Sequence, residues 1–225
     1  MAIIKEERIG GQRLIFGDCL EVMPLLGEFD AVVTDPPYGI GEDGGAQRTR
    51  GKKGYSKHKK KYWDKKRPPK ECFDTIISCS NEQIIWGGNY FCDWLPPSMG
   101  WLYWQKRMGG DFSDGELAWT SRQKALKEFT KCPKGMDKAH PCEKPLVLIE
   151  WCLSLIPNAE TILDPFMGSG TTLVSCEKLG RMGTGIELDP DYFDIACKRV
   201  DEATRQHDLF VEPPAPQPTQ RNFEI

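Results

Sequence analysis

Asp164-Pro165-Phe166-Met167-Gly168-Ser169-Gly170-Thr171-Thr172 is the stretch of the chain that decides the fold class. It follows a short apolar run, residues 161–163, which predicts a buried strand, and it leads into a predicted helix that ends near Leu179. Glycines in the turn let a ligand approach the backbone closely, and the following helix would present free N–H groups. The stretch therefore predicts a strand-turn-helix unit with a ligand at the turn.

The residues around this turn favour a nucleoside ligand without a pyrophosphate. No lysine follows Gly170, as it would in a phosphate-binding loop, and Leu173 stands where a dinucleotide-binding turn has its third glycine. Asp164 would repel a phosphate but suits an ammonium group. Glu187 ends the next predicted strand, where a carboxylate can accept both hydroxyls of a ribose. S-adenosylmethionine has these properties; an ordinary glycine-bearing turn is the alternative.

Strands and helices alternate on both sides of the turn. The sequence predicts strands at 13–16, 29–34, 83–86, 101–104, 116–120, 161–163 and 182–186, and helices at 20–26, 71–80, 145–156, 173–179 and 190–204. The polar residues 121–139 show no regular period and are expected to be irregular. This alternation predicts an α/β fold with a mixed, mostly parallel sheet and helices on both faces. In such sheets, ligands bind at the carboxyl ends of the strands.

Asp35-Pro36-Pro37-Tyr38 follows a second buried strand and offers the groups needed to alkylate an amine. The exocyclic amine of a nucleobase is a poor nucleophile because its lone pair is delocalised into the ring. The Asp35 carboxylate and the Pro36 carbonyl can accept its two N–H bonds, which localises that lone pair. Tyr38 offers a ring face on which a flipped base can stack. A simple proline turn is the alternative, and the neighbouring cofactor pattern weighs against it.

A strongly basic segment comes directly after Tyr38. Residues 46–70 contain twelve lysines and arginines and one acidic residue, in a chain whose net charge is −3. Such a patch indicates a polyanionic partner, although a solvated lysine loop has the same composition. Its position beside the tetrapeptide favours contact with DNA phosphates. The predicted DNA-binding residues are Arg48, Arg50, Lys52, Lys53, Lys57, Lys59, Lys60 and Lys61.

The two motifs together resemble the amino-group DNA methyltransferases, which methylate N6 of adenine or N4 of cytosine. The tetrapeptide at 35–38 precedes the turn at 164–172, and this order resembles the beta class, a circularly permuted form of the Rossmann-like methyltransferase fold. His140-Pro141-Cys142-Glu143-Lys144-Pro145 matches a further cofactor motif of that class, and the resemblance covers residues 10–205 approximately. It implies methyl transfer from S-adenosyl-L-methionine to a base flipped out of double-stranded DNA.

The resemblance also implies roles for single residues. Asp35, Pro36, Pro37 and Tyr38 would be catalytic. The cofactor would contact Asp18, Cys19, Asp35, Lys144, Asp164, Phe166, Gly168, Ser169, Gly170, Thr171, Thr172 and Glu187. In that arrangement Glu187 holds the ribose and Lys144 meets the methionine carboxylate. Asp18 and Cys19 lie near the adenine. The alternatives are a surface lysine at 144 and a helix cap at Asp18. Aromatic residues of 84–91 and 112–119 are predicted to be core.

The first residue of the tetrapeptide indicates the base. In this family Asp at that position leans toward adenine, whereas Ser is commoner in cytosine-N4 enzymes and Asn in RNA or protein methyltransferases. Adenine-N6 is therefore the predicted target, with cytosine-N4 as the alternative. An RNA methyltransferase or a non-catalytic nucleic-acid-binding module fits the intact motifs less well.

The chain is expected to form one methyltransferase domain over 1–210, with a basic DNA-contacting loop at 39–70, a small target-recognition insertion at 105–139 and a proline-rich disordered tail at 211–225. Without a nuclease motif, a stand-alone methyltransferase of phage or bacterial type is predicted. Nine cysteines without a Cys-x-x-Cys pair predict free thiols and no metal site. The lack of a long apolar run predicts a cytoplasmic protein without membrane contact. The resemblance admits a homodimer, of which the residues give no independent sign.

Overall fold

Nine strands form one sheet in the computed structural model, which describes residues 2–41, 63–107, 113–132 and 143–208. The strands are β1 (Ile3–Ile9), β2 (Gln12–Gly17), β3 (Phe29–Thr34), β4 (Ser80–Trp86), β5 (Trp101–Gln105), β6 (Gly115–Thr120), β7 (Lys127–Thr130), β8 (Thr161–Asp164) and β9 (Met182–Glu187). Their order across the sheet is β1-β2-β9-β8-β3-β4-β6-β5-β7. In this described sheet only β1 and β6 run against their neighbours. The predicted α/β fold with a mixed, mostly parallel sheet is confirmed.

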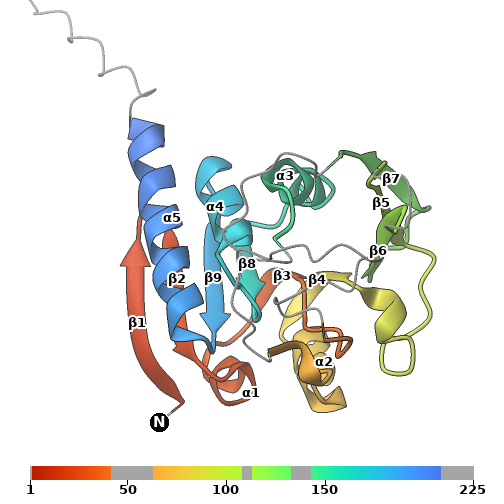
Figure 1. The fold of residues 1–225 in the computed structure, drawn as a ribbon, viewed down its shortest axis with the longest axis horizontal. Helices are drawn as coiled ribbons and strands as arrows, with labels where there is room; N and C mark the ends of the chain where they lie inside the picture. Colours follow the sequence, from red (N-terminus) through yellow and green to blue (C-terminus); the bar gives the residue numbers. More distant parts are fainter. Residues whose placement is uncertain (1, 42–62, 108–112, 133–142, 209–225) are drawn as a thin grey trace, which may run out of the picture.

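Helices cover both faces of the sheet, as the sequence predicts (Figure 1). They are α1 (Cys19–Val22), α2 (Lys70–Ser78), α3 (Leu146–Ser154), α4 (Thr171–Lys178) and α5 (Pro190–Asp208), with 3-10 turns η1 (Met23–Leu25), η2 (Trp63–Lys65) and η3 (Gly88–Tyr90). Side chains alternate along the central strand: Val32 packs in one core with Phe73 of α2, and Val33 in another with Ile149 of α3. No helix in the described ranges has the length and apolarity that crossing a bilayer requires.

The crossover connections lead away in opposite directions from β8 and β3, two parallel neighbours at the centre of the sheet. From β8 the chain passes through α4 to β9 on one side, and from β3 it passes through α2 to β4 on the other. Crossovers that diverge in this way leave a crevice at the carboxyl ends of the two strands. Thr34 Oγ1 donates a hydrogen bond of 2.7 Å to Asp164 Oδ1 across this point. Both sequence motifs therefore start at the crevice.

Two edge strands were not expected from the sequence. β1 pairs antiparallel with β2 through a turn at Gly10, which has φ of +57°. β7 pairs with β5 at the other edge, so the prediction that 121–139 is irregular is wrong for Lys127–Thr130. Both strands are rich in charged residues and bury little, as exposed sheet edges often do. Such strands lack the apolar runs from which the sequence predicts the buried strands.

Several predicted segments lie wholly or partly outside the described residues. This holds for the tail at 211–225 and for the predicted DNA-binding residues from Arg48 to Lys61. Residues on both sides of the basic segment are described, and they are joined by hydrogen bonds. Asp64 Oδ1 accepts one of 2.7 Å from Gly39 N, and the Asp64 carbonyl accepts one of 2.9 Å from Gly41 N. The segment 105–139 contains β6 and β7, so part of it belongs to the central sheet.

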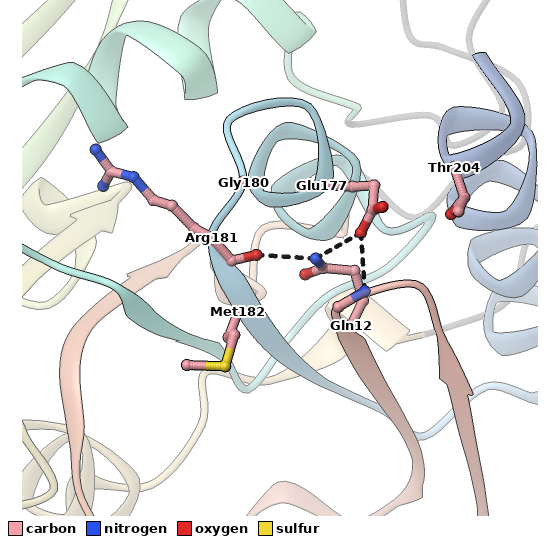
Figure 2. A pocket seen from close by; sticks show the side chains of 7 residues that line it. Gln12, Glu177, Gly180, Arg181, Met182 and Thr204 are labelled. Atoms are coloured by element: carbon pink, nitrogen blue, oxygen red, sulfur yellow. Dashed lines mark hydrogen bonds between the residues drawn. The ribbon is translucent and has the colours of Figure 1, made fainter. Parts of the chain in front are cut away.

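A polar cluster joins β2, α4 and β9 where these two strands begin, at the end of the sheet away from the crevice (Figure 2). Gln12, only 2% exposed, donates from Nε2 to Glu177 Oε2 at 2.8 Å and to the Arg181 carbonyl at 2.9 Å. Its Oε1 accepts a hydrogen bond of 2.7 Å from Gly183 N. Arg181 in turn donates to the carbonyls of Leu153 and Ile156 at the end of α3. These polar groups are hydrogen-bonded to one another, so the cluster stabilises the packing of the strands and helices that it connects.

Candidate active site

One edge of the sheet collects the charged residues of both motifs. Asp35 follows β3, Asp164 ends β8 and Glu187 ends β9. Because β6 is antiparallel to β4, its first residues lie at this same edge, which brings Glu116 beside the ends of the parallel strands. Lys144 reaches the edge from the segment that leads into α3.

Asp35 accepts hydrogen bonds on both carboxylate oxygens. The Tyr38 hydroxyl donates to Oδ1 at 2.5 Å, and Lys144 Nζ donates to Oδ2 at 2.5 Å. The Asp35 side chain is 25% exposed and that of Lys144 only 7%. Burial raises the pKa of Asp35, while the Lys144 ammonium and the Tyr38 hydroxyl oppose that rise. The carboxylate therefore lies in a sheltered place where it holds N–H and O–H donors.

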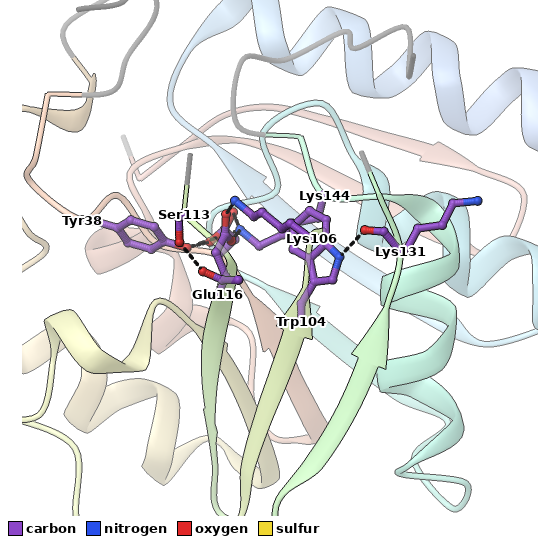
Figure 3. A network of polar contacts seen from close by, with 9 residues as sticks. Tyr38, Trp104, Lys106, Ser113, Glu116, Lys131 and Lys144 are labelled. Carbon is purple, nitrogen blue, oxygen red and sulfur yellow. Dashed lines mark hydrogen bonds and ion pairs between the residues drawn. The ribbon is translucent and has the colours of Figure 1, made fainter. Parts of the chain in front are cut away.

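Lys144 is shared between two carboxylates (Figure 3). Its Nζ lies 3.0 Å from Glu116 Oε2, and Glu116 Oε1 forms an ion pair with Lys106. Burial disfavours the charge on Lys144, but Asp35 and Glu116 outweigh it and raise its pKa above the usual value. Burial also opposes ionisation of Glu116, yet the two ammonium groups lower its pKa to about 2. The network thus brings two ammonium groups and two carboxyl groups together at one end of the sheet.

The Tyr38 ring lies in an aromatic group next to this network. It stacks on Tyr90 with the ring centroids 4.7 Å apart and the planes 15° from parallel, and its edge contacts Phe91. Trp86, Phe91 and Trp119 are buried, which confirms the prediction of core aromatics for them. For Tyr90 that prediction is wrong: it is 37% exposed, because η3 turns it toward the site.

The glycine turn after β8 has the backbone that its sequence predicts. Gly168 and Gly170 have φ of +52° and +81°, and Gly170 is the N-cap of α4. Asp164, 4% exposed, accepts from Thr34 Oγ1 and from Phe166 N at 3.1 Å. Burial raises the pKa of Asp164 to about 6. The carboxylate therefore organises the turn and joins it to β3.

Glu187 is tied to the same turn from β9. Its Oε2 accepts a hydrogen bond of 2.9 Å from Gly168 N, and its Oε1 accepts one of 2.7 Å from Asp189 N. Burial raises the pKa of Glu187 to about 7. Asp18 lies beyond the neighbouring strand, where Phe16 pairs with Glu187, and Asp18 Oδ1 accepts from Leu20 N at 2.8 Å as the cap of α1. Cys19 is the first residue of α1 and is half-buried.

Arg199 of α5 holds the glycine turn through hydrogen bonds, and the sequence did not predict that it belongs to the site. Its Nη1 donates to the carbonyl and Oγ of Ser169, both at 2.7 Å, and to Thr171 Oγ1 at 3.2 Å. Its Nη2 donates to Glu143 Oε1 at 2.6 Å. Arg199 therefore links the glycine turn to the segment that carries Lys144. A polar residue of an amphipathic helix gives no such signal in the sequence.

A pocket of about 60 Å³ lies between the two motifs. Its lining includes Asp35, Lys144, Asp164, Phe166, Ser169 and Thr172. This volume holds only a few atoms, so the pocket suits the reacting ends of two ligands that extend beyond it. Left-handed glycines, the Glu187 carboxylate beside them and the adjacent Asp18 form a cradle that fits a nucleoside with a charged side chain.

The structure brings together most of the predicted site residues. Asp35, Lys144 and residues of the turn at 164–172 line one pocket. Tyr38 is hydrogen-bonded to Asp35, and Glu187 to Gly168 of the turn. Lys144 is neither a surface residue nor free for a carboxylate ligand, since Asp35 and Glu116 hold it. Glu116, Arg199 and Tyr90 were missed, because their roles depend on neighbours far away in the chain.

This fold, in which the tetrapeptide after β3 lies next to the glycine turn after β8, is that of a Rossmann-like methyltransferase. Residues 55–198 match the protein family described as DNA methylase, so the chain belongs to that family. It is therefore an S-adenosylmethionine-dependent DNA methyltransferase of the N6/N4 amino-group class.

Curated relatives agree with this membership, and solved structures agree with the fold. The chain is 25% identical to the type II methyltransferase M.HpaI of Haemophilus parainfluenzae, over 89% of this chain and 78% of the relative. It is 29% identical to M2.DpnII of Streptococcus pneumoniae over 62% of this chain, and spans about half (49%) of that relative. The crystal structure of the M1.HpyAVI-SAM complex superposes with a TM-score of 0.58 at 22% identity, covering 84% of this chain and 99% of that one. The cytosine-N4-specific PvuII DNA methyltransferase superposes with a TM-score of 0.60 at 15% identity, covering 92% and 95%.

Proposed function

We propose that this protein methylates N6 of adenine in double-stranded DNA. The observation that carries the proposal is the Asp35 carboxylate, which lies in the crevice at the end of β3, beside the glycine turn, and holds a nitrogen donor at 2.5 Å. The position of the Lys144 ammonium marks a place where an amine N–H can be accepted. Asp at this position leans toward adenine within the family, so the base follows from the residue type.

The residues of the tetrapeptide have different roles at the exocyclic amine of the target base. Asp35 and the Pro36 carbonyl accept the two N–H groups, so the nitrogen lone pair is freed from the ring. Tyr38 steadies Asp35 through its hydroxyl and offers its ring to the flipped base. Asp35 is also the nearest base for the proton that the amine loses when the new N–C bond forms. S-adenosylmethionine, when bound, supplies the methyl group.

The proposed cofactor residues are those of the glycine turn and the neighbouring strand ends. Glu187 accepts the ribose hydroxyls, Phe166 and Gly168 border the nucleoside, and Asp18 with Cys19 borders the adenine. The methionine end enters the pocket beside Ser169 and Thr171, which Arg199 orients. The predicted contact between Lys144 and the methionine carboxylate would require Lys144 to leave its two carboxylate partners.

Product analysis tests the choice of base. The protein is incubated with methyl-labelled S-adenosylmethionine and unmethylated bacterial genomic DNA, and the DNA is digested to nucleosides. The expected label is in N6-methyladenine. Label in N4-methylcytosine alone would replace the adenine assignment by the cytosine-N4 alternative. In a parallel incubation with total bacterial RNA in place of DNA, label in RNA but not in DNA would reject both.

Cofactor affinity is expected to depend on pH through Glu187. A carboxyl with a raised pKa is protonated below that pKa, so Glu187 loses an acceptor as the pH falls through about 7. Titration calorimetry with S-adenosylmethionine should therefore show affinity about tenfold weaker at pH 6 than at pH 7.5. In Glu187→Gln this dependence should largely vanish between pH 6 and 7.5, with weak binding throughout. A wild-type affinity that is flat over that range would remove Glu187 from the ribose site.

A further inference from the structure

Lys144 is bound to the Asp35 carboxylate, which in the proposed function accepts a hydrogen bond from the amine of the target base. Its Nζ donates to Asp35 Oδ2 at 2.5 Å, while Tyr38 takes Oδ1. A carboxylate has about four lone-pair directions, but Asp35 is half-buried and only part of it faces the pocket. An incoming amine therefore competes with an ammonium group for the same oxygen.

Glu116 is placed to take over this ammonium. Glu116 Oε2 is buried, and among the described residues no group donates a well-aligned hydrogen bond to it. Lys144 Nζ already lies 3.0 Å from that oxygen. Lys106 pairs with the other oxygen, Oε1, and so holds the carboxylate in place. Lys144 can thus transfer its hydrogen bond from Asp35 to Glu116 by a side-chain movement alone.

We propose that Glu116 is a positioning residue that receives the Lys144 ammonium when the target amine binds Asp35. In the free enzyme Lys144 holds the place of the amine and is the counter-ion of the Asp35 carboxylate. In the substrate complex it stays nearby as a counter-ion, bonded to Glu116. The proposal rests on Asp35 being the amine acceptor, as proposed above. Among the described residues, the titratable groups around Lys144 are Asp35, Tyr38, Glu116 and Cys152 of α3, and Lys106 lies behind Glu116. The Trp86 ring lies 5.5 Å from Lys144, and the Asp164 carboxyl acts on Asp35 from the end of β8.

Glu116→Gln tests the exchange directly. A neutral amide holds an ammonium poorly, so Lys144 would stay on Asp35 and obstruct the amine. Turnover of labelled methyl transfer to DNA is expected to fall about tenfold or more, with unchanged affinity for S-adenosylmethionine. The negative charge of Glu116 raises the pKa of Asp35, so its removal should move the acid limb of the turnover–pH profile to lower pH. Lys144→Met should move that limb to higher pH, since Asp35 loses its counter-ion.

The double variant shows whether Glu116 acts through Lys144. In the Lys144→Met background, Glu116→Gln is expected to change turnover by less than about twofold, because there is no ammonium left to receive. An undiminished loss in that background, or full turnover of Glu116→Gln alone, would overturn the proposal. If Lys144→Met does not fold, the pH profile of Glu116→Gln decides: an acid limb that stays in place or moves up refutes the exchange.

Two further variants separate this inference from other effects. Glu128→Gln removes an exposed carboxylate from the edge strand β7 and should leave turnover unchanged, which controls for the general effect of charge on DNA binding. Asp35→Ala tests the proposed function itself. An inactive Asp35→Ala beside a fully active Glu116→Gln would refute only the exchange, whereas an active Asp35→Ala would refute the role of Asp35 on which it rests.

Discussion

Asp35→Ala is expected to lower methyl-transfer turnover by about 100- to 1000-fold, because it removes a preorganised acceptor at the reacting nitrogen. Cofactor affinity should change by less than about threefold, since among the described residues neither the glycine turn nor Glu187 is hydrogen-bonded to Asp35. Lys144 keeps Glu116 as a partner, so the buried ammonium is not left without a counter-charge. Single-turnover rates with labelled cofactor, together with calorimetric binding, measure both quantities.

Asp30 provides a matched control on the same strand. It lies at the other end of β3, where Oδ2 accepts hydrogen bonds from Glu160 N and from the backbone and hydroxyl of Thr161. Asp30→Ala should lower the midpoint of thermal unfolding but leave turnover per folded molecule within about twofold. If Asp35→Ala instead loses cofactor affinity as severely as Glu187→Ala, Asp35 belongs to the cofactor site rather than to the amine.

Gly87→Ala is expected to lower turnover about 100-fold by displacing the Tyr38 ring. A Cβ at this position would lie 2.0 Å from Tyr38 Cε1, so the ring would have to move. Its movement would break the stack on Tyr90 and the hydrogen bond from the hydroxyl to Asp35. The left-handed backbone at Gly87 adds a stability cost of about 1–2 kcal/mol. S-adenosylmethionine binding should persist, because the glycine turn is untouched.

Gly180→Ala separates the clash from the backbone strain. Gly180 has the same φ of +67° as Gly87, but nothing lies within 4 Å of the point that a Cβ would occupy there. Both variants should therefore lose similar stability from the backbone, as measured by urea unfolding, and only Gly87→Ala should lose turnover. Equal turnover in the two variants would show that the position of Tyr38 does not matter for the reaction.

Local patterns in the sequence predicted the central part of the fold. The strands predicted at 29–34, 161–163 and 182–186 correspond to β3, β8 and β9, and the glycine turn has the left-handed conformations expected of it. Asp189 caps α5 by accepting from Asp191 N and Tyr192 N, as its place before Pro190 indicates. These features depend on residues close together in the chain, whose backbone preferences and burial patterns are readable locally.

The edge strands could not be predicted in the same way. In β7, Lys127–Thr130, only Phe129 packs against the core, through a ring contact with Trp151 at 5.2 Å. One apolar residue in four gives no detectable period. The strand exists because the backbone of β5 offers hydrogen-bonding groups along a free edge, and this depends on where β5 lies in the sheet.

The sequence by itself determined that the tetrapeptide at 35–38, the glycine turn at 164–172 and Glu187 lie near one another. Each stands at the end of its own strand, and the carboxyl ends of parallel strands meet at one edge of the sheet. Only the tertiary structure decided that Lys144 pairs with Asp35, that Glu116 stands behind it and that Tyr90 covers Tyr38. Glu116 begins a strand rather than ending one, and the antiparallel direction of β6 brings it to the site. Strand direction and side-chain contacts between distant segments are set by packing of the whole sheet, which no local pattern encodes.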